Sequence, residues 1–120
     1  MYELAIKGDF AAAHVLRGYE GNCKNLHGHT WKVEVVIVGE DLDRIGMVMD
    51  FKIVKKKLKD FLCRLDHIYL NDLPAFKDIN PTTEHLAKYI FEEFAPECLP
   101  LHIKRVQIWE SDSASVTYYE

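Results

Sequence analysis

The chain has 120 residues, of which 48% are hydrophobic and 28% charged, and it carries a formal net charge of −4 at pH 7. This length predicts one domain over residues 1–120, and the acidic balance argues against a nucleic-acid-binding protein, which usually carries a basic excess. No apolar stretch approaches the length of a membrane span, and the first residues lack the pattern of a secretory signal. Three widely spaced cysteines without a CxxC pair suit a reducing compartment, so we expect a cytoplasmic protein.

Two strands are predicted in the first third of the chain. Apolar residues of one parity predict a strand over residues 2–14, with a bulge or bend at Gly8. A second strand is predicted over about 27–38, where the odd positions are two histidines followed by apolar residues. Residues two apart in a strand point to the same side, so His27 and His29 present neighbouring imidazoles.

A helix is predicted in the middle of the chain, over about residues 51–65. Asp50 is a suitable N-cap, and apolar residues recur at helical spacing with lysines opposite, which predicts a solvated lysine face. A long loop is expected over 68–80, where Pro74 and several turn-forming residues occur.

A second helix and two strands complete the predicted fold. Thr82 is the expected cap of this helix, and Pro96 and Pro100 are expected to end it. Strands are predicted over 103–110 and 115–119. The order strand, strand, helix, helix, strand, strand (ββααββ) predicts an α+β fold, with a four-stranded antiparallel sheet and both helices on one face. Oligomerisation is one way to cover the open edges of such a sheet.

The histidines predict a metal site. His14 ends the first strand, and with His27 and His29 it forms a patch of three imidazoles. A lone histidine on an apolar face is usually a hydrogen-bonded core residue, but two at strand spacing with a third nearby favour a metal. Three histidines with an open fourth position are typical of catalytic zinc, although copper or iron also accept imidazoles.

One cysteine close in sequence to this patch has two interpretations. Cys23 is either a fourth ligand, which would make the site structural, or a reactive thiol acting as base or nucleophile. Cys63, inside the first predicted helix, is more typical of a buried small apolar residue.

An acidic residue and a histidine follow the first helix. Asp66 and His67 are either a helix terminus or an acid–base pair, and Asp66 can orient His67 only if the backbone leaves the helix there. Glu110 has the parity of the inward-facing residues of its strand, so its carboxylate needs donors, such as two adjacent N–H groups of a ligand. The alternative for Glu110 is a strand end facing water. Thr82 and Thr83 are helix caps first and ligand contacts second.

Five motifs in this order resemble the 6-pyruvoyltetrahydropterin synthase superfamily: Phe10-Ala11-Ala12-Ala13-His14, Cys23-x-x-x-His27-Gly28-His29, Leu65-Asp66-His67, Asn80-Pro81-Thr82-Thr83-Glu84 and Trp109-Glu110. Three residues separate Cys23 from His27, a spacing similar to the 6-carboxytetrahydropterin synthase branch of queuosine (7-deazaguanine) biosynthesis. The pyruvoyl-forming branch typically carries a longer insert there, and the branch that cleaves dihydroneopterin for folate typically has glutamate in place of this cysteine.

The resemblance implies a tunnelling fold (T-fold), in which the sheets of three subunits close into a barrel and two trimers commonly stack. Active sites would then lie between the subunits of a homo-oligomer, which is a hexamer where two trimers stack. The implied substrate is 7,8-dihydroneopterin triphosphate, and the implied products are 6-carboxy-5,6,7,8-tetrahydropterin, acetaldehyde and triphosphate. The alternatives are the sister reaction that yields 6-pyruvoyltetrahydropterin and a non-catalytic zinc- or pterin-binding module.

The resemblance also implies roles for individual residues. Zn²⁺ would be held by His14, His27 and His29, with Cys23 as general base. His67, supported by Asp66, would be the complementary acid–base group, from the same or a neighbouring subunit. Glu110 would anchor the pterin, and Thr82, Thr83 and Glu84 would shape its pocket. Arg17 and Lys24 are candidates for the triphosphate by proximity alone.

Overall fold

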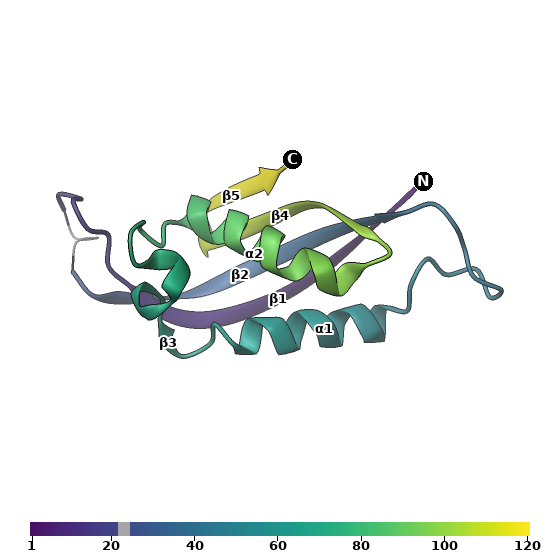
Figure 1. Ribbon diagram of the computed structural model, residues 1–120, viewed down its shortest axis with the longest axis horizontal. Coiled ribbons are helices and arrows are strands. Elements are labelled where there is room, and N and C mark those ends of the chain that lie inside the picture. The colour runs from purple at the N-terminus through teal and green to yellow at the C-terminus, as the bar shows by residue number, and fades with distance from the viewer. Residues whose placement is uncertain (22–24) are drawn as a thin grey trace.

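The computed structural model describes residues 1–21 and 25–120 and contains a twisted sheet with two helices on one face (Figure 1). The sheet has the strand order β3-β1-β2-β4-β5. Neighbouring strands are antiparallel except for the parallel pair β1 and β3. The elements are β1 (Tyr2–His14), β2 (His27–Gly39), α1 (Phe51–Cys63), β3 (Ile68–Tyr69), α2 (Thr83–Cys98), β4 (His102–Ser111) and β5 (Ala114–Tyr119). This arrangement confirms the predicted α+β fold.

One strand of the described sheet was not predicted. Ile68–Tyr69 opens the expected loop, but it pairs in parallel with Ala12 and Ala13 as β3, which makes the sheet five-stranded rather than four-stranded. A strand of two residues has no alternation to detect, so only its pairing with β1 reveals it. The rest of this connection contains short 3₁₀ turns at Leu70–Asp72 and Pro74–Phe76.

Alternation along the strands determines which face is covered by the helices. The even positions of β1 and the odd positions of β2 pack under the helices, where residues such as Phe10, Trp31 and Val35 are fully buried. Each large apolar side chain buried in this way stabilises the fold by about 1.5–3 kcal/mol. The other face carries ion pairs instead, including Arg105 with Glu34 at 2.7 Å.

Gly8 lies in a regular strand, so the predicted bulge or bend at this position is wrong. It pairs with Val33 without a register shift, and the described irregularity between β2 and β4 lies instead at Val36/Ile37. A Cβ atom at Gly8 would lie 2.8 Å from Leu62 Cδ1. Glycine is therefore needed here because α1 packs closely on β1, and not because the strand bends.

Both predicted helix starts are confirmed by their caps. Asp50 accepts a hydrogen bond from the Lys52 N–H at 2.8 Å, and Thr82 Oγ1 accepts one from the His85 N–H at 3.1 Å. Such caps contribute about 1 kcal/mol each.

Pro96 lies inside α2, so the prediction that it ends this helix is wrong. Pro96 lies in the last turn and removes only one helical hydrogen bond, the one to the carbonyl of residue 92, which is exposed. The helix can therefore continue to Cys98. None of the helices in the described part of the chain is long and apolar enough to span a membrane.

Cys63 is exposed, which contradicts the prediction of a buried residue. Phe61 and Leu62 occupy the buried side of α1 immediately before it. The next residue is rotated by about 100° and faces solvent.

Candidate metal centre and active site

Three imidazoles converge at one end of the β1–β2 pair. The antiparallel register places His14 opposite His27 and Ala12 opposite His29. The ring centroids are 4.5 Å apart for His14 and His27, 5.2 Å for His14 and His29, and 4.8 Å for His27 and His29. One ligand nitrogen of each ring lies within 4.8 Å of the other two. The predicted histidine patch is therefore present.

The hydrogen bonds of these rings identify the nitrogens that face one another. His14 Nδ1 lies 2.8 Å from the Pro81 carbonyl oxygen, and His27 Nδ1 lies 2.6 Å from that of Asn25. A carbonyl only accepts, so Nδ1 carries the proton in each neutral ring and Nε2 keeps its lone pair. The Nε2 atoms of all three histidines are buried without a hydrogen-bond partner in the protein. Three unpaired buried ring nitrogens at one point fit a divalent metal ion.

Burial also sets the charge of the patch. Desolvation lowers the pKa of His14 and of His29, and the neighbouring His27 lowers both further. The Pro81 carbonyl opposes this effect at His14, and the Glu110 carboxylate opposes it at both residues. At His14 and His29 the balance favours neutral imidazoles, which is the form that binds a metal.

Glu110 faces the histidine patch, as its strand parity predicted. Its Oε1 lies 3.7 Å from His29 Nε2, and its Oε2 accepts a hydrogen bond from Thr83 Oγ1 at 2.9 Å. Thr83, at the first turn of α2, is only 8% exposed. Thr82 is occupied as the helix cap, and Glu84 is exposed. The structure thus brings Thr83 and Glu110 together beside the histidines.

Asp66 and His67 form a hydrogen-bonded pair beside the edge of β1 that faces away from β2. His67 has a φ of 58°, so the backbone has left the helical conformation, and its Nδ1 lies 2.8 Å from Asp66 Oδ2. Asp66 Oδ1 accepts a hydrogen bond from the Ala11 N–H at 2.8 Å. This backbone N–H, followed by the hydrogen bond from His67, lowers the pKa of Asp66. The geometric condition for Asp66 to orient His67 is therefore met.

In a single subunit His67 lies outside the cluster of metal-ligand atoms formed by the three histidines. It lines an open depression of about 830 Å³ together with His29 and with Ala11, Ala13 and Gly28, and the last three belong to the face turned away from the helices. Its side chain is 81% exposed. Among residues 1–21 and 25–120, the cluster of potential metal-ligand atoms contains the three histidines but neither Asp66 nor His67.

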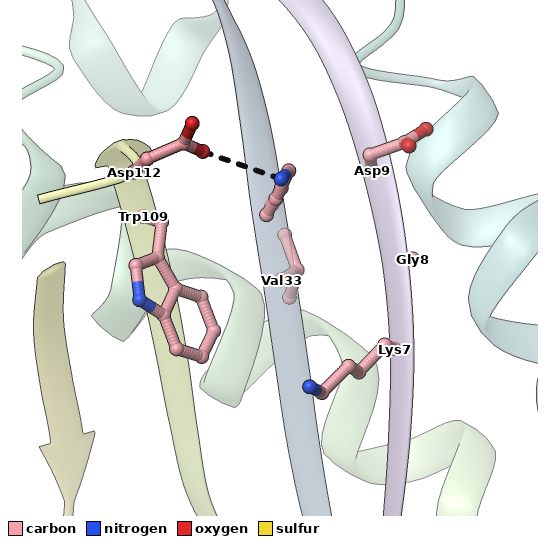
Figure 2. Close-up of a pocket in the computed structure, with 7 residues that line it drawn as sticks. Lys7, Gly8, Asp9, Val33, Trp109 and Asp112 are labelled. Atoms are coloured by element: carbon pink, nitrogen blue, oxygen red, sulfur yellow. Dashed lines mark hydrogen bonds and ion pairs between the residues drawn. The ribbon is translucent and has the colours of Figure 1, made fainter.

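Another cavity, of about 490 Å³, lies on this open face and contains none of the predicted site residues. Figure 2 shows Trp109 at one side and Asp9 and Lys7 at the other, with an ion pair between Lys32 and Asp112 at 3.3 Å. Its charged groups of both signs lie on the face opposite the helices, whereas His14 is buried beneath them, so we do not assign the active site to it.

Two of the predicted residues, Cys23 and Lys24, lie outside the described residues. Arg17 is described, and its guanidinium donates hydrogen bonds to the carbonyl oxygens of Phe76, Lys77 and Ile79. Because most of its donors are engaged with the protein's own backbone, the structure does not support Arg17 as a triphosphate ligand.

Three further residues near the site escaped prediction. Asn71 and Asn80 hold the chain that leaves β1, and the Trp31 ring lies 5.1 Å from the rings of both His14 and His29. Trp31 Nε1 is buried without a partner. Asn80 stands in the Asn-Pro-Thr-Thr-Glu motif, which was a usable signal, whereas Asn71 has no distinguishing pattern around it.

Comparisons with known proteins agree with this geometry. The family model described as 6-pyruvoyl tetrahydropterin synthase matches residues 3–120. A 6-carboxy-5,6,7,8-tetrahydropterin synthase of Synechocystis is 35% identical over 92% of this chain and 87% of its own length. A dihydroneopterin monophosphate aldolase of Pyrococcus furiosus is 38% identical over 92% of this chain and 90% of its own.

A solved structure has the same fold. The 6-pyruvoyl tetrahydropterin synthase of Caenorhabditis elegans superposes with a TM-score of 0.86 at 28% identity, and the match covers 99% of this chain and 95% of that one. The names of these three relatives denote three different reactions, so they determine the family but not the product. The chain belongs to the 6-pyruvoyl tetrahydropterin synthase family and is an enzyme, a lyase of the pterin synthase type.

Proposed function

We propose that this chain is a zinc-dependent 6-carboxy-5,6,7,8-tetrahydropterin synthase of queuosine biosynthesis. With water, 7,8-dihydroneopterin triphosphate would yield 6-carboxytetrahydropterin, acetaldehyde and triphosphate. The observation that carries the proposal is the convergence of three buried, unpaired Nε2 atoms beside Glu110. The relative from Synechocystis and the three-residue spacing between Cys23 and His27 favour the carboxy product.

His14, His27 and His29 would hold the metal through Nε2. When bound, zinc would act as a Lewis acid toward the hydroxyl oxygens of the substrate side chain. Three protein ligands leave a position open for the substrate, which is typical of catalytic rather than structural zinc. The metal's identity is part of the proposal, because neutral imidazoles also suit copper and iron.

Glu110 would anchor the pterin ring. A carboxylate with two oxygens matches the 2-amino group and the N3–H of a pterin, which are two adjacent donors. The Thr83 hydroxyl already donates to Oε2, and this hydrogen bond would hold the carboxylate in one orientation. Thr82 and Glu84, on either side of Thr83, would shape the rest of the pocket.

Proton transfer would be divided between Cys23 and His67. Cys23 would take a proton from the substrate side chain as a thiolate, and His67 would be the complementary acid–base group. The Asp66 carboxylate accepts from His67 Nδ1, so the other ring nitrogen, Nε2, is the one that would exchange protons with the substrate.

A homo-oligomer would bring these parts together. Both edges of the described sheet are open, at β5 and along most of β1, where β3 covers only Ala12 and Ala13. Pairing of these edges between three copies would close a barrel, with two barrels stacked as a hexamer. His67, exposed and outside the metal-ligand cluster of its own subunit, would serve the metal of a neighbour. The whole described domain, within residues 1–120, would form one such subunit.

The test is product analysis by mass spectrometry after incubation of the zinc-loaded protein with 7,8-dihydroneopterin triphosphate. We expect a 6-carboxy product and acetaldehyde. A 6-pyruvoyl product would contradict the assigned branch but leave the family and the metal site intact. No turnover with zinc bound would contradict the proposed substrate.

A further inference from the structure

We infer that Arg17 and Asn80 are positioning residues of the metal centre. They hold the Pro81 carbonyl against His14 and thereby determine which nitrogen His14 offers to the metal. This inference rests on the metal binding of the proposed function but concerns residues to which neither the family resemblance nor the comparisons give this role.

The Pro81 carbonyl belongs to a segment with little regular structure. Between β3 and α2 the chain makes only short 3₁₀ turns, and the helix begins at Thr83. Nevertheless Pro81 is buried, and its carbonyl oxygen lies 2.8 Å from His14 Nδ1. Something outside the segment must fix this carbonyl, because a loop without ladder or helix hydrogen bonds is otherwise free to move.

The guanidinium of Arg17 donates hydrogen bonds to several carbonyls of this segment. Its Nη1 donates to the Lys77 carbonyl at 2.8 Å, and its Nη2 donates to those of Phe76 and Ile79, both at 2.7 Å. Its Nε lies 3.3 Å from Asn80 Oδ1. The planar guanidinium presents five donors in a rigid fork, so it can fix several carbonyls at once, which a lysine cannot.

Asn80 fastens the same segment to the backbone that leaves β1. Its Oδ1 accepts from the Arg17 N–H at 2.9 Å, and its Nδ2 donates to the Arg17 carbonyl at 2.8 Å. The amide thus pairs with both backbone groups of one residue, as a neighbouring strand would. On the other side, His85 Nδ1 donates to the Asn80 carbonyl at 2.6 Å. Asn80 is therefore held at both its side chain and its backbone.

The contacts of Arg17 and Asn80 described above form a clamp. This clamp acts on His14 through Pro81, the residue that follows Asn80. Pro81 follows Asn80 directly, and its ring locks φ, so fixing Asn80 also restricts where the Pro81 carbonyl carbon lies. Thr82, the next residue, is held as the cap of α2, which limits the rotation about ψ that would turn the carbonyl oxygen away. Arg17 lies only three residues after His14, so a short stretch of chain connects the clamp to the ring that it orients. While the carbonyl stays in place, the His14 proton stays on Nδ1 and the lone pair of Nε2 remains directed toward His27 and His29.

Asn71 provides a matched control. It makes the same two-way pair with Val15, accepting from its N–H at 3.0 Å and donating to its carbonyl at 3.1 Å. Val15 directly follows His14, but Asn71 does not hold Pro81. If the clamp merely stabilised the chain beyond β1, Asn71→Ala and Asn80→Ala would have the same effect on the metal site.

The experiment compares Arg17→Met, Asn80→Ala and Asn71→Ala with the unmodified chain. Zinc affinity is measured by competition with a chelator, and the tautomer of His14 is read from its ring ¹⁵N shifts in the metal-free protein at alkaline pH. We expect Arg17→Met and Asn80→Ala to bind zinc about 10–100-fold more weakly, as for other groups that orient a ligand. In both variants we expect His14 to populate the second tautomer, and in Asn71→Ala we expect both measurements to stay close to those of the unmodified chain.

Two results would overturn the inference: unchanged zinc affinity and His14 tautomer in Asn80→Ala, or equal changes in Asn71→Ala and Asn80→Ala. If Arg17→Met does not fold, Arg17→Lys keeps the charge but loses the fork, and it is expected to weaken zinc binding by a smaller factor. The tautomer is measured without metal and without substrate, so its outcome is independent of whether the proposed reaction is correct.

Discussion

His14, at the end of β1, and His67, beside β1, differ in exposure and in hydrogen-bond partners. His14 is 1% exposed, on the face covered by the helices, and burial lowers its pKa. His67 has a side chain that is 81% exposed, on the open side, where an ionised Asp66 accepts from its Nδ1. Burial with an unpaired nitrogen suits a permanent metal ligand, and exposure beside a carboxylate suits a group that exchanges protons. The same side chain can thus have two functions according to its surroundings.

Removing a buried histidine should have the largest effect. His29→Ala deletes one of three Nε2 ligands, and we expect stoichiometric zinc binding to be lost, together with turnover. Metal content after dialysis, measured by inductively coupled plasma mass spectrometry, checks this result. His102→Ala, on an exposed residue of β4, is the control and should retain zinc. Full zinc content in His29→Ala would remove this residue from the metal site.

Removing the exposed histidine should affect catalysis and leave the metal in place. His67→Ala should reduce kcat by about 10²–10⁴-fold, the usual contribution of a general acid or base, with zinc content unchanged. If His67 serves a neighbouring subunit, mixed oligomers of His67→Ala and His29→Ala should recover part of the activity, because some sites would contain both intact groups. No recovery would place His67 with the metal of its own subunit.

Cys23→Ala distinguishes the two roles of the thiol. We expect turnover to be abolished while zinc remains near stoichiometric, because the three histidines supply the metal ligands. The measurement is metal content alongside product formation. Loss of zinc would instead make Cys23 a fourth ligand and the site structural.

A smaller effect is expected at the pterin anchor. Glu110→Gln keeps the size of the side chain but removes the charge, so the pterin should bind roughly 10–100-fold more weakly, as expected for hydrogen bonds to a charged group. Titration with a non-reactive pterin checks this value, and Glu93→Gln, on the exposed side of α2, is the control. Unchanged affinity in Glu110→Gln would remove its anchoring role.

The smallest expected effect concerns stability in acid. The pKa of Asp66 is lower in the folded chain than its ordinary value of 3.8, so the unfolded chain binds the extra proton. Its stabilising contribution is therefore present above pH 3.8 and is lost as the pH falls through the lower folded value. In urea unfolding across this range, Asp66→Asn should show a shallower decline than the unmodified chain. Parallel declines would mean that the carboxylate hydrogen bonds do not contribute.

Much of the fold could be predicted because its signals are local. Alternation along residues 2–14 and 27–39 assigns each side chain to a face, and caps at Asp50 and Thr82 mark both helix starts. Pro96 misled the prediction because a proline in the last turn costs little, and β3 is too short to have a pattern.

The sequence by itself determined that His27 and His29 share a face, because the two-residue period of a strand needs no partner. It assigned Glu110 the inward parity but left a strand end facing water as the alternative. Tertiary structure alone decided the rest. The hydrogen bond from Ala11 to Asp66 joins residues 55 apart, and that between His14 and Pro81 joins residues 67 apart. Arg17 was a candidate ligand for the triphosphate, but a loop distant in sequence packs against it. Carbonyl oxygens of that loop accept the hydrogen bonds of its guanidinium. Such contacts depend on how separate elements pack, and no local pattern encodes them.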